Sequence, residues 1–572
     1  MRKFICKLVL ISIAFSLMAE SPIMTAMKLE IERSMDKLMM EDMEKPYFIS
    51  YNITDEDGWI IVAASGGVIK TQPRRNRRLH TNVRVGNYDM DNSNFRSQSY
   101  WWSLRPDNMP IGNDITVARY TLWKSTDDSY KSALENLARK KSVIEQTQQE
   151  QNYPDFSKEE PNKFIKEYDG DFELNQTVWE EKAIAFSDIL YENPEIQRSS
   201  VSFYAGNNAK YFVNSEGSAI EFSGDFHEAL AIGIAQAEDG TYVLDSEIRY
   251  YSSEDDIDWD EFEESCYELS NRLAKMRNAD TLDYFLGPIL FKEQASAEFF
   301  AQSLDSRINA PSKPIYENKD RNMFQSGDND FENKLGRKVA STHISIFDDP
   351  NIEEFNDIKL LGHYKYDDEG VKAWRVGIIE QGILKSFLMS RKPFRYLRKS
   401  NGHGRQAWSG ISASMANLFI ESEEEVTEKK LIDKYLELIE EENLEYGIVV
   451  EKLSTSYIFN ISSSTGVRSI LNRLGDGFRR IDTNSDILPP LVFYKIYPDG
   501  RKEYLRKMAF SDLGSRALRD IETTSKEKYV YNSFNGKSLS VIAPKFFILE
   551  EAELVRMDMS GDKQPVIAKH KK

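Results

Sequence analysis

Strand-length apolar runs separated by turn residues place the strongest constraint on the fold of this chain. Between residues 47 and 85 the runs YFISYNI, WIIVAASGGVI and HTNVRV alternate with turns, a pattern typical of antiparallel strands. A second group of apolar runs surrounds a turn at residues 214–217. The chain is again mostly strand-like after residue 337, and residues 491–506 are predicted to form a hairpin whose turn is Pro498-Asp499-Gly500.

Helical periodicity appears in fewer places. Residues 27–44, 127–141 and 431–439 each repeat apolar side chains at helical spacing. Cys266 lies on another such stripe, so we interpret it as a core thiol rather than a nucleophile. Residues 307–337 contain two prolines and a polar, glycine-containing stretch, which is typical of a flexible connection or lid.

The first residues have the pattern of an export signal. Arg2, Lys3 and Lys7 precede an apolar run of 12 residues, 8–19, which is shorter than the roughly 20 residues needed to cross a bilayer. This order of charge and apolar run predicts a signal peptide at residues 1–19, and hence a periplasmic or secreted protein without an integral membrane segment. A buried N-terminal helix is the alternative.

The charge of the chain argues against nucleic acid as a partner. The formal net charge is −19, whereas electrostatic affinity for nucleic acid requires a cationic face. One basic cluster occurs at residues 74–78, and no aromatic residue is interleaved with its arginines. We interpret it as a solvated turn or a strand edge.

Common catalytic motifs are missing from the sequence. There is no Gly-x-Ser-x-Gly elbow and no P-loop, which argues against a serine hydrolase and a P-loop nucleotide site. His227-Glu228 does not continue to a second histidine one helical turn on, so it does not predict a zinc helix.

Two histidines leave local possibilities open. His363 and His403 lie among aspartates, and together they could form a non-standard metal site. His403 is also flanked by glycines and followed by Arg405, so these two residues are candidates for binding, with Arg405 holding the carboxylate of a peptide terminus. The alternative is a tight loop with a solvent-facing histidine.

Several segments together resemble the TldD/PmbA family of zinc metallopeptidases and their zinc-less relatives. The resemblance rests on their order along nearly the whole chain after the signal. The segments are YFISY at 47–51, RVGNY at 84–88, VNSEG at 213–217, GPILF at 287–291, DDP at 348–350, DDEG at 367–370, IEQGILK at 379–385 and NLFI at 417–420.

The resemblance implies an α+β fold. It consists of an N-terminal α/β domain with an antiparallel sheet and helices (residues 27–306), the connection at 307–337, and a C-terminal mostly-β domain (residues 338–572). It also implies cleavage of small or unfolded peptides by a homo- or hetero-oligomer in which one subunit carries zinc and a sibling subunit does not. In the zinc-bearing relatives the strand and helix matching residues 288–306 end in His-Glu-x-x-x-His, and a later cysteine is the third ligand.

This sequence departs from that pattern at each ligand. Ala301 and Ser306 replace the two histidines, Gln302 replaces the glutamate base, and no cysteine follows Cys266. We therefore assign no catalytic residue, no metal ligand and no cofactor by resemblance, although zinc is expected in active relatives.

Three hypotheses follow. The leading one is an exported, zinc-less relative that binds peptides or is the partner of a zinc-bearing sibling subunit in a proteolytic complex. The second is an active metallopeptidase with a metal site near His363 and His403. The third is a stand-alone envelope binding protein.

Overall fold

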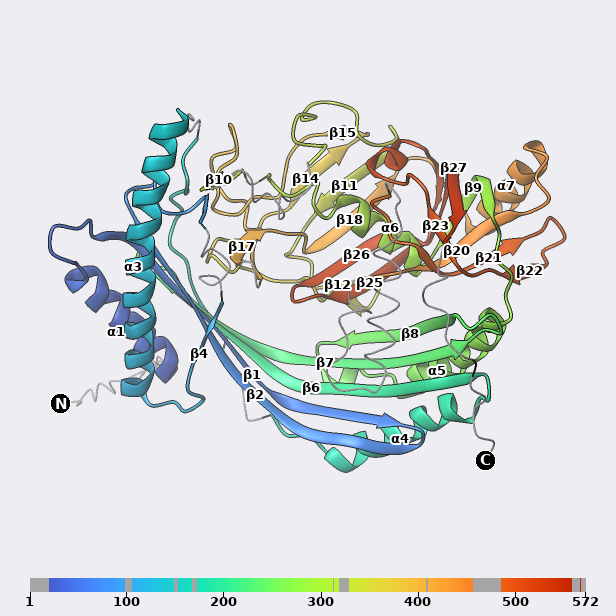
Figure 1. Cartoon of the computed structure of the whole chain (residues 1–572), viewed down its shortest axis with the longest axis horizontal. Coiled ribbons are helices and arrows are strands. Elements are labelled where there is room, and N and C mark those ends of the chain that lie inside the picture. The colour runs from blue at the N-terminus through green and yellow to red at the C-terminus, as the bar shows by residue number, and fades with distance from the viewer. Residues whose placement is uncertain are drawn as a thin grey trace, which may run out of the picture.

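A computed structural model describes residues 20–97, 105–148, 153–166, 172–311, 313–317, 329–407, 410–455, 485–557 and 566. The predicted signal peptide lies outside these residues. The described part of the chain is an α+β protein with an N-terminal and a C-terminal domain, as the sequence predicted (Figure 1).

A long curved sheet dominates the N-terminal domain. Its order is β4-β2-β1-β6-β7-β5, with β8 paired to β7. Gly58 of β1 faces Gly206 of β6, and a Cβ on Gly58 would lie only 2.8 Å from the Gly206 Cα. The glycine pair therefore allows a close approach that side chains would prevent. The strands are β1 (Pro46–Ala64), β2 (Gly67–Val85), β4 (Asp107–Asn108), β5 (Lys163–Lys166), β6 (Ile196–Asn214), β7 (Ala219–Gln236) and β8 (Tyr242–Tyr251).

Helices cover the outer side of this sheet and one of its ends (Figure 1). Helices α4 (Gln176–Glu192) and α5 (Trp259–Arg277) pack against the sheet, and Cys266 is fully buried in their shared core, as predicted. Helix α3 (Ile115–Thr147) contains the predicted helix 127–141 and packs against α1 (Pro22–Lys37). Helix α1 ends earlier than predicted, and the Ser21 side chain accepts a hydrogen bond from Met24 N–H at its start.

The arginines at residues 74–78 lie within β2 rather than in a turn. Arg75 and Arg77 are opposite Asp57 and Asp55 of β1, and the Arg77 Nε donates to Asp55 at 2.8 Å. Arg77 is buried, whereas the Arg75 side chain is 57% exposed and pairs with Asp57. The cluster is therefore a cross-strand charge ladder whose members differ greatly in burial.

Two sheets form most of the C-terminal domain, which lies over the other face of the curved sheet (Figure 1). The predicted hairpin is present as β21 and β22, and the predicted helix 431–439 lies in α7 (Glu428–Glu441). The first sheet has the order β15-β14-β11-β18-β26-β25: β11 (Ile344–Asp348), β14 (Val376–Glu380), β15 (Ile383–Leu384), β18 (Asn417–Ser422), β25 (Lys528–Phe534) and β26 (Ser538–Pro544). The second has the order β19-β24-β27-β9-β20-β21-β22, with β23 on β27: β9 (Tyr284–Lys292), β19 (Glu425–Val426), β20 (Gly447–Leu453), β21 (Pro490–Ile496), β22 (Lys502–Tyr504), β23 (Met508–Phe510), β24 (Ile521–Ser525) and β27 (Phe546–Arg556).

Small two-stranded pairs and short helices complete the described elements. Strand β3 pairs with β10, β12 with β13, and β16 with β17. These are β3 (Phe95–Arg96), β10 (Ile315–Tyr316), β12 (Glu354–Phe355), β13 (Ile358–Lys359), β16 (Gly404–Ala407), β17 (Gly410–Ala413) and the 3-10 helices η1 (Glu254–Asp256) and η3 (Ser515–Arg519). Among the described residues, no helix is long and apolar enough to cross a membrane.

Helix α6 (Gln294–Leu304) lies in the core of the C-terminal domain. Strand β9, which precedes it, hydrogen bonds with β20 and β27, and α6 packs on β20 and β26. Phe299 and Phe300 pack against Phe547 at ring-centroid distances of 5.0 and 5.4 Å. By strand pairing, β9 and α6 belong with the C-terminal sheets, although the sequence grouped them with the first domain.

Candidate functional site

The end of α6 is the place where the metallopeptidase motif was expected. Ala301 and Gln302 lie in the last turn of α6, and Ser306 follows it. Gln302 Nε2 donates to the Ser454 carbonyl at 3.0 Å, and Leu488 N–H donates to Gln302 Oε1 at 2.8 Å. Both ends of the carboxamide are therefore engaged by backbone groups from two other segments.

These residues do not fit a zinc ion. Ala301 offers no lone pair, and the carboxamide of Gln302 is already used in two hydrogen bonds. Among the residues that the structure describes, no group of three or more His, Cys, Asp or Glu side chains is arranged to hold a metal.

Glu298 lies one turn before Gln302 and is 1% exposed. Its carboxylate accepts hydrogen bonds from Gln294 Nε2 at 2.9 Å and from Leu453 N–H at 2.7 Å. Burial raises the pKa of Glu298 to about 7, although these hydrogen bonds and Lys452 oppose the shift. Glu298 and Gln302 thus both tie α6 to the end of β20.

A cluster of opposite charges surrounds the exposed end of α6. Asp305 is exposed and forms no side-chain hydrogen bond with any described residue, while Lys537 makes a long contact of 3.4 Å with Ser412. Surrounding protein atoms nevertheless desolvate the Asp305 carboxyl and raise its pKa, and Lys537 opposes this shift. Burial, followed by the charge of Arg405, lowers the pKa of Lys537. An acid and an amine shifted toward each other in this way are typical of functional sites.

Arg405 is buried and held by internal contacts. Its Nε lies 3.4 Å from Asp368, and its guanidinium carbon lies 4.4 Å from the centre of the Tyr364 ring. Asp368 also pairs with Lys210 of β6 at 3.2 Å, and this ion pair links the two domains. Arg405 therefore contributes positive charge beside Lys537 instead of extending from a loop into solvent.

His403 is fully buried, in contrast to the solvent-facing alternative. Its Nε2 lies 3.2 Å from Asp348, and its Nδ1 lies 3.0 Å from the side-chain oxygen of Asn401. Both ring nitrogens therefore face oxygen atoms of the protein rather than an open position where a metal could bind.

His363 and His227 do not lie in a group of possible metal ligands among the described residues. His363 Nδ1 lies 2.8 Å from the Pro350 carbonyl, and its Nε2 lies 3.4 Å from Glu353. His227 is on β7, not on a helix, and neither of its ring nitrogens has a partner in the described protein. Trp179 and Phe172 lie close to its ring.

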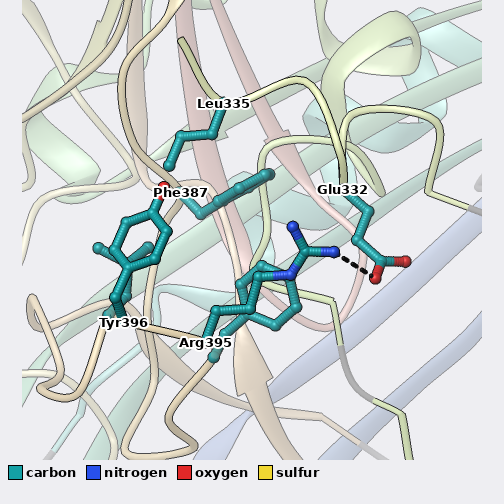
Figure 2. Close-up of a pocket in the computed structure, with 7 residues that line it drawn as sticks. Glu332, Leu335, Phe387, Arg395 and Tyr396 are labelled. Carbon is teal, nitrogen blue, oxygen red and sulfur yellow. Dashed lines mark hydrogen bonds and ion pairs between the residues drawn. The ribbon is translucent and has the colours of Figure 1, made fainter.

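A separate surface pocket lies in the C-terminal domain (Figure 2). Leu335, Phe387 and Tyr396 contribute to its wall, and Arg395 pairs with Glu332 across it at 3.1 Å. It includes none of the residues at the end of α6.

Sequence reasoning missed Glu298, Asp305 and Lys537. Glu298 and Gln302 are spaced four residues apart on α6, a signal that they share a helix face. No comparable signal links Asp305 with Lys537, because only the tertiary fold brings these distant residues together.

Comparison with known proteins agrees with this fold. Residues 287–471 match the PmbA/TldA metallopeptidase C-terminal domain. A metalloprotease of Methanocaldococcus jannaschii is 38% identical over 100 residues, which are 17% of this chain and 21% of the relative. A metalloprotease of Methanothermobacter thermautotrophicus is 27% identical over 212 residues, 36% of this chain and 42% of the relative. The chain thus spans about a fifth to two fifths of the length of these curated relatives.

A solved structure extends the fold comparison to the whole molecule. TldE from Thermococcus kodakarensis superposes with a TM-score of 0.56 and 14% identity, covering 93% of this chain and 100% of that chain. At this identity the likeness shows the fold alone. The domain match supports the resemblance of residues 287–471 to the TldD/PmbA family, and the structural likeness extends the fold over both domains.

Proposed function

We propose that this chain is an exported, zinc-less member of its family that binds peptides or is the partner of a zinc-bearing sibling subunit. The observation that carries the proposal is Gln302, which holds two backbone segments together at the position expected for the glutamate base. A residue engaged in this way supports the helix packing and cannot act as a general base.

The charged end of α6 supports the peptide-binding part of the proposal. Asp305 and Lys537 offer a carboxylate and an ammonium close enough for each charge to affect the other. Such a pair suits the two charged termini of a short peptide, and the charge of Arg405 adds positive potential at Lys537.

Metal analysis of the purified protein tests the zinc-less part. We expect no stoichiometric zinc after exposure to zinc and dialysis, and no change on His363→Ala or His403→Ala. Stoichiometric zinc that is lost in either variant would instead favour the metal site near His363 and His403.

Peptide binding tests the role of the charged cluster. Lys537→Gln should weaken binding of a short free peptide about tenfold, because one charge-assisted contact of about 1.5–3 kcal/mol is lost. Lys526→Gln, at an exposed lysine, is the matched control and should leave affinity unchanged. Equal affinities of all three proteins would exclude this cluster as the binding site.

Co-purification distinguishes a subunit from a stand-alone binding protein. An adjacent reading frame that encodes His-Glu-x-x-x-His would identify the sibling to be co-expressed. A stable complex supports the partner role, whereas peptide binding without any complex favours the stand-alone envelope protein.

A further inference from the structure

Three methionine side chains are open to solvent in the loop between α1 and β1, residues 39–43, which we call the methionine loop. Met39, Met40 and Met43 are 56%, 43% and 50% exposed, and no other methionine among the described residues is exposed. Single exposed apolar side chains are ordinary in proteins, whereas three within five residues concentrate thioether groups in one place. The loop lies at the end of the molecule that α1 and α3 form, on the left in Figure 1.

Helix α3 fixes the backbone of the methionine loop. Met40 N–H donates a long hydrogen bond of 3.5 Å to the Tyr130 hydroxyl, and that hydroxyl donates to the Glu44 carbonyl at 2.7 Å. Tyr130 is fully buried in the core of the N-terminal domain, and Lys141 of α3 pairs with Glu44 at 3.2 Å. The three methionines therefore extend from a loop that is held on both sides.

A tight turn brings two of these side chains close together. Met43 N–H donates to the Met40 carbonyl at 3.0 Å, which closes a four-residue turn. The Cα atoms at the two ends of such a turn lie within about 7 Å of each other. Because each methionine has three rotatable side-chain bonds, the sulfur atoms of Met40 and Met43 can reach a common point beside the turn. Met39 directly precedes Met40 and can supply a third sulfur.

The chemistry of these side chains indicates the kind of ligand. Thioether sulfur is a soft ligand that favours Cu(I), whereas carboxylate oxygens favour Mg²⁺, Ca²⁺ and Mn²⁺. Unlike a cysteine or a protonated histidine, a thioether loses no proton when it binds a metal. Glu41 and Asp42 are exposed between the methionines, so their negative charges attract cations and interrupt any apolar patch on which a partner protein could dock.

We propose that the methionine loop binds one soft monovalent cation, Cu(I) or Ag(I), through the sulfur atoms of Met39, Met40 and Met43. Each sulfur donates a lone pair, and the oxidation state of the ion does not change. The site belongs to the N-terminal domain, whereas the end of α6 belongs to the C-terminal domain. It does not depend on the function proposed above.

NMR of the methionine methyl groups tests the proposal on the intact chain. Protein labelled with ¹³C at these methyl groups is first treated with N-ethylmaleimide, which blocks the thiol of Cys6, and silver nitrate is then added in chloride-free buffer. The signals of the three loop methionines should shift together and saturate at one equivalent, because each methyl carbon is bonded to a coordinating sulfur. The signal of the buried Met276 should not move. Unchanged signals from the loop methionines would overturn the proposal.

Other ions separate coordination by sulfur from simple attraction to the carboxylates. Cu(I), kept reduced with ascorbate, should shift the same three signals, whereas Mg²⁺ and Zn²⁺ at the same concentration should leave them in place. Equal shifts with Mg²⁺ would contradict the assignment to sulfur. Hydrogen peroxide converts exposed methionines to sulfoxides and should abolish the binding of Ag(I). Binding that survives this oxidation would also exclude the thioethers as ligands.

Leucine variants identify the ligands. Leucine keeps the size and apolar character of methionine but lacks the sulfur, so Met40→Leu and Met43→Leu should fold normally. Each should weaken Ag(I) binding at least about tenfold, since even the groups that only support a metal ligand contribute that much. Met90→Leu, at a half-buried methionine outside the loop, is the matched control and should bind as the wild type does. Unchanged affinity in both loop variants, or an equal loss in Met90→Leu, would overturn the proposal.

Discussion

Glu298 is a buried acid on α6, and its burial disfavours ionisation of the carboxyl group. Its pKa is about 7 in the folded protein against 4.5 in the unfolded chain, so its contribution to stability is present below pH 4.5 and is lost as the pH rises through 7. Glu298→Gln removes this loss. The free energy of unfolding of the variant relative to wild type should therefore increase by up to about 3 kcal/mol between pH 5 and 8.

Urea unfolding at several pH values measures this difference. Parallel pH profiles of the two proteins would show that Glu298 does not titrate in this range.

His227 titrates with the opposite sign. Burial lowers its pKa below 6.5, so the unfolded chain takes up a proton that the folded protein does not, and stability falls as the pH drops below 6.5. His227→Leu removes this loss and also removes two unpartnered nitrogens, which cost about 1–3 kcal/mol. Thermal unfolding should show a more stable variant, with a margin that grows toward acid. A variant that is less stable at every pH would mean that the imidazole makes a favourable contact.

At the scale of elements, the β1–β2 charge ladder contains a buried and an exposed arginine, each paired with an aspartate. The two pairs therefore allow the effect of burial on stability to be compared with that of pairing alone. Arg77 is buried and bonds to Asp55 and to the Pro110 and Gly112 carbonyls, whereas Arg75 is exposed. Arg77→Ala should cost about 3–5 kcal/mol because it leaves a partly buried carboxylate and two carbonyls without their donor. Arg75→Ala should change stability by less than about 1 kcal/mol.

Chemical denaturation of both variants tests the ladder. Similar losses in the two variants would show that burial does not control the strength of these pairs. Added salt should matter only for the Arg75 pair, since exposed charges are screened.

At the scale of the whole molecule, Arg391 is a buried side chain that links the two domains directly. Arg391→Gln breaks its bonds to Glu216 and Ser157 and should cost about 3–5 kcal/mol. Hydrogen exchange should increase on both sides of the domain boundary, in residues 155–157 as well as 389–392. Arg395→Gln, at a neighbouring exposed pair, is the matched control and should leave exchange at residues 155–157 unchanged. Faster exchange confined to residues 389–392 would mean that Arg391 supports only its own loop.

Sequence reasoning could predict the local elements of the fold. The hairpin at 491–506, the helix at 431–439 and the core position of Cys266 all depend on periodicity within one segment, and each is present. The grouping of β9 and α6 with the C-terminal sheets could not be read in this way. It depends on pairing with β20 and β27, which follow more than 150 residues later, and local periodicity carries no information about such partners.

The sequence by itself determined the α+β class, the resemblance to the TldD/PmbA family and the replacement of the metallopeptidase motif by Ala301, Gln302 and Ser306. These depend on residue identity and spacing along the chain. Only the tertiary structure decided that Gln302 joins two backbone segments, that His403 is buried against Asp348, and that Asp305 and Lys537 are close enough for their charges to interact. Burial and through-space charge set the hydrogen bonds of Gln302 and His403 and shift the pKa values of Asp305 and Lys537, and both arise only when distant segments pack together.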